Sequence, residues 1–132
     1  MFTVRFEPHP QLNPDREGYP RSVVVRMYQL EGAYAFASAT FEDLWAGVGK
    51  SSPSVVVGPD EMTLIPGRRE TRSVKRNAKT THLGVTANFR EYHPDSGWKA
   101  TLELPQAGNP CDENAPKLEV TVELANYTLQ LR

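Results

Sequence analysis

The amino-acid sequence predicts an all-β fold, an antiparallel sandwich of two sheets with about eight strands and a small helical insertion after the second strand. Three observations support this prediction. Short segments with an apolar residue at every second position recur along the chain, which is typical of half-buried strands. Turn-forming residues separate these segments, since the chain contains 9 Gly and 11 Pro. One stretch joins a strand-like segment to an apolar helical face.

Length and charge limit the class of protein. The 132 residues are enough for one domain, which we expect to span residues 1–132. The 15 Lys and Arg and the 16 Asp and Glu give a net charge of −1, so no overall field attracts the chain to nucleic acid. The sequence contains neither a transmembrane stretch nor a signal peptide pattern. Its single cysteine, Cys111, cannot form an internal disulfide.

The first predicted strand has apolar residues at every second position, at Phe2, Val4 and Phe6. We expect it to stop at Pro8. Residues 9–21 then form a predicted loop of 13 residues that is rich in proline and charge. Because loops of this length are uncommon between strands and often carry function, this loop is the first candidate site.

Residues 22–30 are β-branched and aromatic, which suits a strand that is covered on both faces. A helix is predicted next, because apolar residues recur at helical spacing at Phe41, Leu44, Trp45 and Val48. Thr40 and Asp43 have the spacing of an N-terminal capping box. We therefore place a helical insertion at about residues 33–58, in which the short apolar run 55–57 fits either a strand or a helix.

The rest of the chain is predicted to form a meander of short strands. Pro66-Gly67 is a turn signal between the first two of them, and residues 93–97 form another turn. The last two predicted strands have the clearest alternation. The expected strands cover residues 62–65, 70–75, 83–90, 98–104, 118–124 and 127–131.

No pattern in the sequence indicates catalysis. It contains no nucleophile elbow, no Walker loop and no HExxH motif. The three histidines, His9, His82 and His93, lie far apart with no carboxylate or Cys at ligand spacing, so we predict no metal site. Trp45 and Trp98 fall on apolar faces and are expected in the core. These observations favour binding over catalysis.

One segment, residues 68–79, concentrates positive charge. Its basic residues are Arg68, Arg69, Arg72, Lys75, Arg76 and Lys79. Such a run can meet a phosphate, lipid headgroups or an acidic partner. Alternatively, it protects a solvated edge strand from pairing with other molecules, and we favour this interpretation because no aromatic residues are interleaved with the charges.

An ordered set of short segments along nearly the whole chain is similar to one known family. These segments are Leu12-Asn13-Pro14-Asp15, Val23-Val24-Val25-Arg26-Met27-Tyr28-Gln29-Leu30, Phe36, Phe41, Leu44-Trp45, Leu64-Ile65-Pro66-Gly67, Leu83-Gly84-Val85, Ala87, Phe89-Arg90-Glu91 and Trp98-Lys99-Ala100. In this order they resemble the TssJ (SciN-like) outer-membrane lipoproteins of the type VI secretion system.

The resemblance implies a transthyretin-like β-sandwich without enzymatic activity, cofactor or small-molecule substrate. It implies a structural lipoprotein that binds the periplasmic C-terminal domain of the inner-membrane protein TssM and anchors the secretion complex at the outer membrane. The family contact involves the loop between the first two strands, here residues 9–21. The residues that we expect to contact the partner are Leu12, Asn13, Asp15, Arg16, Tyr19 and Arg21.

The chain departs from the family at its start. The family carries an acylated cysteine at the mature N-terminus, whereas this sequence begins Met1-Phe2-Thr3. Cys111 lies in a late loop with no apolar region before it and does not replace that cysteine. We therefore expect a soluble form without signal peptide or lipid anchor, and a native protein tethered to the periplasmic face of the outer membrane.

Two other functions stay open at this point. The first is a transthyretin-like binding module for carbohydrate or a small ligand, which predicts Tyr19, Tyr92 and Trp98 around a concave cleft. The second is a hydrolase on the same sandwich, which requires His, Ser and Asp side chains to converge in space.

Overall fold

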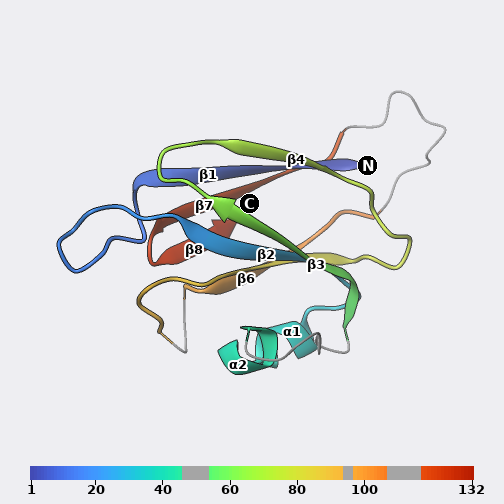
Figure 1. Ribbon diagram of the computed structural model, residues 1–132. Coiled ribbons are helices and arrows are strands. Elements are labelled where there is room, and N and C mark those ends of the chain that lie inside the picture. Colours follow the sequence, from blue (N-terminus) through green and yellow to red (C-terminus); the bar gives the residue numbers. More distant parts are fainter. Residues whose placement is uncertain (46–53, 94–96, 107–116) are drawn as a thin grey trace.

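In the computed structural model, which describes residues 1–45, 54–93, 97–106 and 117–132, eight strands form two facing four-stranded sheets (Figure 1). The elements are β1 (Phe2–Leu12), β2 (Val23–Leu30), α1 (Tyr34–Ser38), α2 (Phe41–Trp45), β3 (Val55–Leu64), β4 (Glu70–Val74), β5 (His82–Ala87), β6 (Lys99–Glu103), β7 (Glu119–Asn126) and β8 (Thr128–Leu131). One sheet has the strand order β4-β1-β7-β8 and the other β3-β2-β5-β6. The predicted two-sheet sandwich with a helical part after the second strand is confirmed.

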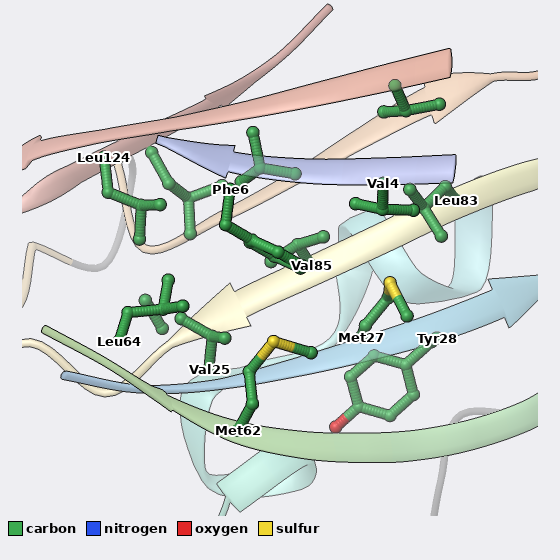
Figure 2. Close-up of a cluster of buried hydrophobic side chains, with 14 of the residues drawn as sticks. Val4, Phe6, Val25, Met27, Tyr28, Met62, Leu64, Leu83, Val85 and Leu124 are labelled. Carbon is green, nitrogen blue, oxygen red and sulfur yellow. The ribbon is translucent and has the colours of Figure 1, made fainter. Parts of the chain in front are cut away.

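The core lies between the sheets and follows the alternation of the sequence. In β1, Phe2, Val4 and Phe6 are buried, and the residues between them are more exposed. Figure 2 shows Val4 and Phe6 pointing toward Leu83 and Val85 of the opposite sheet. Burying each such side chain contributes about 1.5–3 kcal/mol relative to leaving it exposed, so the alternating residues hold the two layers together.

The first strand is longer than predicted. It continues through Pro8 to Leu12, so the connection to β2 comprises residues 13–22 instead of 9–21. The pairing of β1 with β4 ends at Phe6, so on that side Pro8 needs no N–H to donate to a partner strand. On the other side, the register with β7 shifts between Pro8 and Leu12. Proline is tolerated at such an irregular strand end.

Strand order differs from the predicted meander in two places. β4 crosses to the other sheet and pairs with β1, whereas β5 pairs with β2. In addition, β1 and β7 run parallel, so the sandwich is mainly rather than wholly antiparallel. The interpretation of β4 as an edge strand agrees with its place in the sheet, because β4 is the last strand of its sheet and pairs there with β1.

The helical part is shorter than the predicted insertion at residues 33–58. Residues 55–58 belong to β3, where Val55 and Val57 pair with β2. The predicted capping box is present: the N–H of Thr40 donates to Asp43 Oδ2 at 2.8 Å, and the N–H of Asp43 donates to Thr40 Oγ1 at 3.2 Å. Val48 lies outside the described residues. Within those residues, no helix is long and apolar enough to span a membrane.

Two cations from the sheet hold the helices on its outer face. Lys99 of β6 donates through Nζ to the carbonyl oxygens of Phe36 at 3.0 Å and Ala37 at 2.6 Å, at the end of α1. Arg26 of β2 donates to the carbonyl oxygen of Leu44 in α2 at 2.8 Å. Helix C-terminal carbonyls lack intrahelical partners, so both contacts satisfy groups that would otherwise need water.

Candidate functional site

The candidate site is the loop of residues 13–22, which crosses from one sheet to the other at one end of the sandwich (Figure 1). Asn13 begins it with φ of 49°, a left-handed conformation that asparagine tolerates better than most residues. Its buried side chain donates from Nδ2 to the carbonyl oxygen of Ser22 at 2.9 Å, and Oδ1 accepts from the N–H of Arg90 at 2.7 Å. Asn13 thus joins both ends of the loop to the segment after β5.

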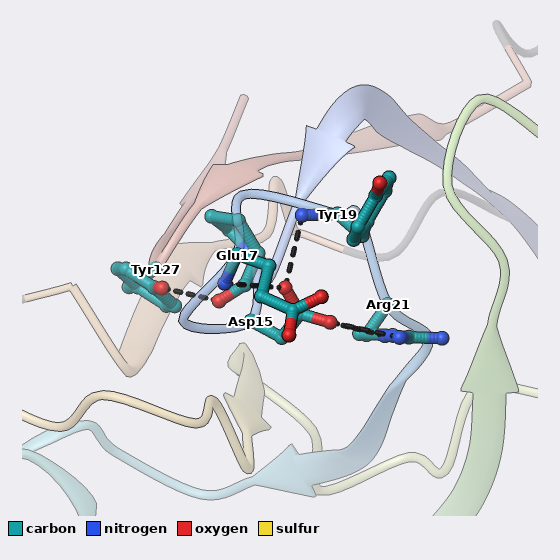
Figure 3. A network of polar contacts seen from close by, with 6 residues as sticks. Asp15, Glu17, Tyr19, Arg21 and Tyr127 are labelled. Atoms are coloured by element: carbon teal, nitrogen blue, oxygen red, sulfur yellow. Dashed lines mark hydrogen bonds and ion pairs between the residues drawn. The ribbon is translucent and has the colours of Figure 1, made fainter.

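Asp15 organises the middle of the loop (Figure 3). Its Oδ1 accepts from the N–H groups of Glu17 at 2.9 Å and Tyr19 at 3.0 Å, and its Oδ2 accepts from the Arg21 guanidinium at 2.9 and 2.8 Å. Partial burial acts to raise the pKa of Asp15, but the hydrogen bonds from Arg21, Tyr19 and Glu17 and the charge of Arg21 outweigh it. The net effect lowers the pKa of this carboxyl group. The contacts in the loop therefore stabilise the ionised form of Asp15.

A third contact connects the loop to Tyr127, which lies between β7 and β8. The hydroxyl of Tyr127 donates to the carbonyl oxygen of Pro14, and Phe89 meets the Tyr127 ring edge to face at 6.4 Å. Within the loop, the N–H of Gly18 donates to the carbonyl oxygen of Asp15 at 2.9 Å. These contacts, with those of Asn13 and Asp15, define one conformation for the loop.

The structure divides the six predicted contact residues into buried, ion-paired and exposed ones. Leu12 is in the core and Asn13 is only 3% exposed, so their side chains support the loop from inside. Asp15 and Arg21 use their charged groups on each other. Arg16 and Tyr19 are exposed, and the ring of Tyr19, with 60% of its surface accessible, points away from the Asp15 network (Figure 3).

Two further segments reach the same end of the molecule, and sequence reasoning did not assign them to the site. The turn at residues 65–69 contacts the end of β1, since the N–H of Gly67 donates to the carbonyl oxygen of Pro8 at 3.1 Å. The segment at residues 88–92 is joined to the loop through Arg90 and Asn13. Because these segments are far from the loop in sequence, no local pattern could have placed them together.

The aromatic cleft expected of a carbohydrate-binding module is not formed by the three aromatic residues predicted for it. Tyr92 and Trp98 are in contact, with ring centroids 5.8 Å apart, and both pack on Phe41 at 4.8 and 5.3 Å. Trp98, however, is 3% exposed and belongs to the core. A cavity of about 410 Å³ at the loop end is lined by Pro8, His9, Arg69 and Glu123 among others, and by none of these aromatics.

The histidines are distributed over different parts of the fold. His9 lies on β1 and accepts at Nδ1 from the N–H of Gln11 at 3.0 Å, whereas Nδ1 of His82, on β5 in the other sheet, lies 2.8 Å from Thr81 Oγ1. In the described part of the chain, no group of three or more His, Cys, Asp or Glu residues is arranged to hold a metal ion.

Comparisons with known proteins agree with this fold. A chain in a structure described as a type VI membrane complex is 25% identical, with a TM-score of 0.81 over 99% of this chain and 96% of that chain. A chain in the structure of the T6SS protein TssM C-terminal domain from EAEC is also 25% identical, with a TM-score of 0.78 and the same coverage of 99% and 96%. The T6SS lipoprotein TssJ1 from Pseudomonas aeruginosa is 22% identical, with a TM-score of 0.79 over 99% of this chain and 93% of that one.

Sequence comparison gives the same family. No curated protein matches this chain. The family model T6SS-SciN, described as type VI secretion lipoprotein with the names VasD, EvfM and TssJ, matches residues 1–127. Since the match covers nearly the whole sequence, this chain belongs to the type VI secretion lipoprotein family that includes TssJ.

Proposed function

We propose that this domain is a non-enzymatic structural component of a type VI secretion membrane complex. In this proposal it binds the periplasmic C-terminal domain of TssM and anchors the complex at the periplasmic face of the outer membrane. Its family supports the lipoprotein role. Similar chains in a type VI membrane complex and in a structure of the TssM C-terminal domain support the choice of partner.

The observation that carries the proposal is the ordered loop of residues 13–22, which presents an exposed aromatic ring. Tyr19 keeps 60% of its surface accessible, although the backbone on both sides of it is fixed by Asp15 and Asn13. A loop that is already in one conformation loses little conformational entropy on binding. Tyr and Arg side chains dominate the energy of many protein interfaces, so Tyr19 and Arg16 are the proposed contact residues.

The other four predicted residues have a supporting role in this proposal. Leu12 packs in the core and Asn13 joins the loop to its neighbours. The ion pair of Asp15 and Arg21 fixes the backbone that carries Tyr19. Substitution of these residues is expected to weaken binding indirectly, because the loop loses its order. Substitution of a contact residue such as Tyr19 should weaken binding and leave the loop ordered.

The position of the loop fits anchoring by a lipid on the N-terminal side of the domain. β1 begins at the end of the sandwich opposite to the loop (Figure 1). Its 11 residues place these ends roughly 33 Å apart. A tether before β1 would therefore leave the loop free to face a partner from the other side of the periplasm.

Binding to the periplasmic C-terminal region of TssM from the same genome tests the proposal. We expect Tyr19→Ala to weaken binding by roughly tenfold or more, as for an interface hot spot. Tyr34→Ala is the matched control, because Tyr34 is an aromatic residue on α1 with 86% of its surface exposed. Absence of binding by the folded wild-type domain would contradict the proposal, and equal losses in both variants would move the contact away from the loop.

The anchoring part has its own test. The protein extracted from its native cell envelope should fractionate with the outer membrane and be heavier than the polypeptide by the mass of the attached acyl chains. Mass spectrometry of the intact protein measures this difference. A polypeptide of unmodified mass in that fraction would contradict lipid anchoring and leave the binding proposal to be judged by its own experiment.

A further inference from the structure

Four exposed arginines lie at the loop end of the sandwich, and we call them the arginine surface: Arg16, Arg68, Arg69 and Arg90. None of them takes part in an ion pair with another described residue. The described pairs join Arg5 to Glu119, Arg21 to Asp15, Arg26 to Glu61, and Arg132 to Glu7 and Glu123. The charge of the arginine surface is therefore available to a molecule outside the chain.

Three segments that are distant in sequence bring these arginines together. Arg16 is on the loop of residues 13–22, and the backbone N–H of Arg90 donates to Asn13 at the start of that loop. Arg68 and Arg69 follow the turn whose Gly67 donates to Pro8 near the end of β1. Figure 1 shows the loop, this turn and residues 88–92, which follow β5, gathered at one end of the sandwich.

Exposed apolar side chains lie on the same segments. Tyr19, Ile65 and Tyr92 keep 60%, 42% and 41% of their surface accessible, one on each segment. Interfaces commonly combine a few aromatic or apolar anchors with arginine and a polar rim. The loop end has this composition, whereas an exposed charged surface without such anchors would be an ordinary solvated face.

The charge of this end differs in sign from that of the whole chain. The three segments, residues 13–22, 65–69 and 88–92, contain five Arg and three acidic residues, which leaves a net charge of +2. The complete chain has a net charge of −1. The remaining residues are therefore negative in sum, and a negatively charged partner is guided toward the loop end in preference to the rest of the surface.

We propose that the arginine surface extends the docking site of the loop and is complementary to an acidic protein surface. The inference rests on the proposed function, in which the partner is the TssM C-terminal domain, and it predicts that the contacted face of that domain is acidic. Charges at the rim of an interface mainly accelerate association and fix its orientation. The arginine surface should thus act on the association rate more than on the dissociation rate.

The basic segment at residues 68–79 provides a matched control, because it has exposed basic residues both before and after β4, and the two ends of this strand lie at opposite ends of the sandwich. Arg68 and Arg69 precede the strand at the loop end. Lys75 and Lys79 follow it at the opposite end, since Val74 pairs with Phe2 at the start of β1. Both pairs are exposed, so reversing either pair changes the net charge of the chain equally and leaves the core intact.

The experiment compares association rates with the TssM domain for wild type, Arg68→Glu/Arg69→Glu, Lys75→Glu/Lys79→Glu and Arg90→Glu. The wild-type rate should fall several-fold between about 50 and about 300 mM salt. The Arg68/Arg69 variant should associate roughly tenfold more slowly at low salt and depend less on salt. Arg90→Glu, which changes a different segment, should act in the same direction, and the Lys75/Lys79 variant should match wild type.

The outcomes separate this inference from the proposed function. Thermal unfolding of each variant first establishes that it is folded. If wild type binds through Tyr19 but its rate is independent of salt, or if the arginine and lysine pairs act equally, the arginine surface is not a docking site and the proposed function stands. If the folded wild-type domain does not bind the TssM domain at all, the proposed function itself is contradicted.

Discussion

At the scale of single residues, Asn13 connects the loop to the rest of the fold. A left-handed backbone conformation and two side-chain hydrogen bonds meet in this one buried residue. Aspartate would bring an acceptor where the carbonyl oxygen of Ser22 needs a donor, and glycine would supply the backbone conformation without the hydrogen bonds. Only an amide side chain of this length satisfies both the Ser22 carbonyl and the Arg90 N–H group.

Asn13→Ala is expected to destabilise the domain. It leaves the Ser22 carbonyl and the Arg90 N–H unsatisfied, at about 1–3 kcal/mol for each group that stays buried, and it adds the strain of a left-handed alanine. Asn126→Ala is a good control, because Asn126 has φ of 51° but an exposed side chain. Chemical denaturation of both variants measures the difference. Equal losses of unfolding free energy would mean that the Asn13 side chain contributes nothing beyond its backbone conformation.

Asp15 makes the order of the loop depend on pH. Its pKa in the folded protein lies below the value in the unfolded chain, so the stabilisation is fully present above the unfolded value of about 3.8. It is lost as the pH falls through the lower, folded value. NMR titration should give an Asp15 pKa below 3.8, with the Glu17 and Tyr19 amide signals shifting along the same curve. Asp15→Asn should remove that titration, and an unshifted pKa in wild type would refute the network as described.

The sequence could indicate this loop but not the roles of its residues. Its length, prolines and charges mark residues 9–21 as a connection, and a connection is where binding residues are expected. Whether a residue faces the core or the solvent depends on its spatial neighbours. Asn13 is hydrogen-bonded to Arg90 and Asn126, which lie 77 and 113 positions further along the chain, and no local pattern contains that information.

At the scale of elements, the two short helices depend on the sheet beneath them. Each has only five residues, which is too short to be stable alone in water. Phe36 of α1 inserts against Tyr28 of β2 with ring centroids 5.3 Å apart, and Lys99 holds the end of the same helix. Burial lowers the pKa of Lys99, and the nearby carboxylate of Asp43 acts against this effect. The sequence could predict the capping box because its two residues are three positions apart. It could not predict the contacts of Lys99 and Arg26 with the helices, because these cations lie on strands that are distant in sequence.

Gly84 of β5 makes room for that helix. A Cβ atom at this position would lie 2.9 Å from Leu30 Cδ1 and 3.0 Å from two ring atoms of Phe36, both fully buried side chains. Gly84→Ala should therefore destabilise the domain by about 1–3 kcal/mol, as for an overpacked core. Combining it with Phe36→Leu should cost less than the sum of the two single variants, because the smaller side chain removes the clash. Strict additivity in denaturation experiments would show that Phe36 does not limit the space at Gly84.

At the scale of the whole molecule, alternation determined the faces of the strands but not their neighbours. The buried positions of β1 and β7 are those that a two-residue period predicts. The same period is satisfied by many strand orders, so it does not distinguish a meander from a chain in which β4 crosses to the other sheet. That order depends on the total burial of both sheets, to which every strand contributes.

We propose that residues 1–132 unfold as one domain, with the helices included, because Phe36 of α1 and Leu44 of α2 belong to the same described core as the buried residues of both sheets. The two tryptophans test this proposal. Trp45 lies on α2, and Trp98 packs against Phe41 of the same helix at 5.3 Å, so fluorescence reports on the helical side while far-UV circular dichroism reports on the strands. The two signals should change with the same midpoint in denaturant.

Phe6→Ala, in the core between the sheets and far from either tryptophan in sequence, should lower both midpoints together, consistent with a loss of about 3–5 kcal/mol. An earlier fluorescence transition in wild type, or a Phe6 variant that shifts only the circular dichroism, would show that the helical part melts independently of the sandwich.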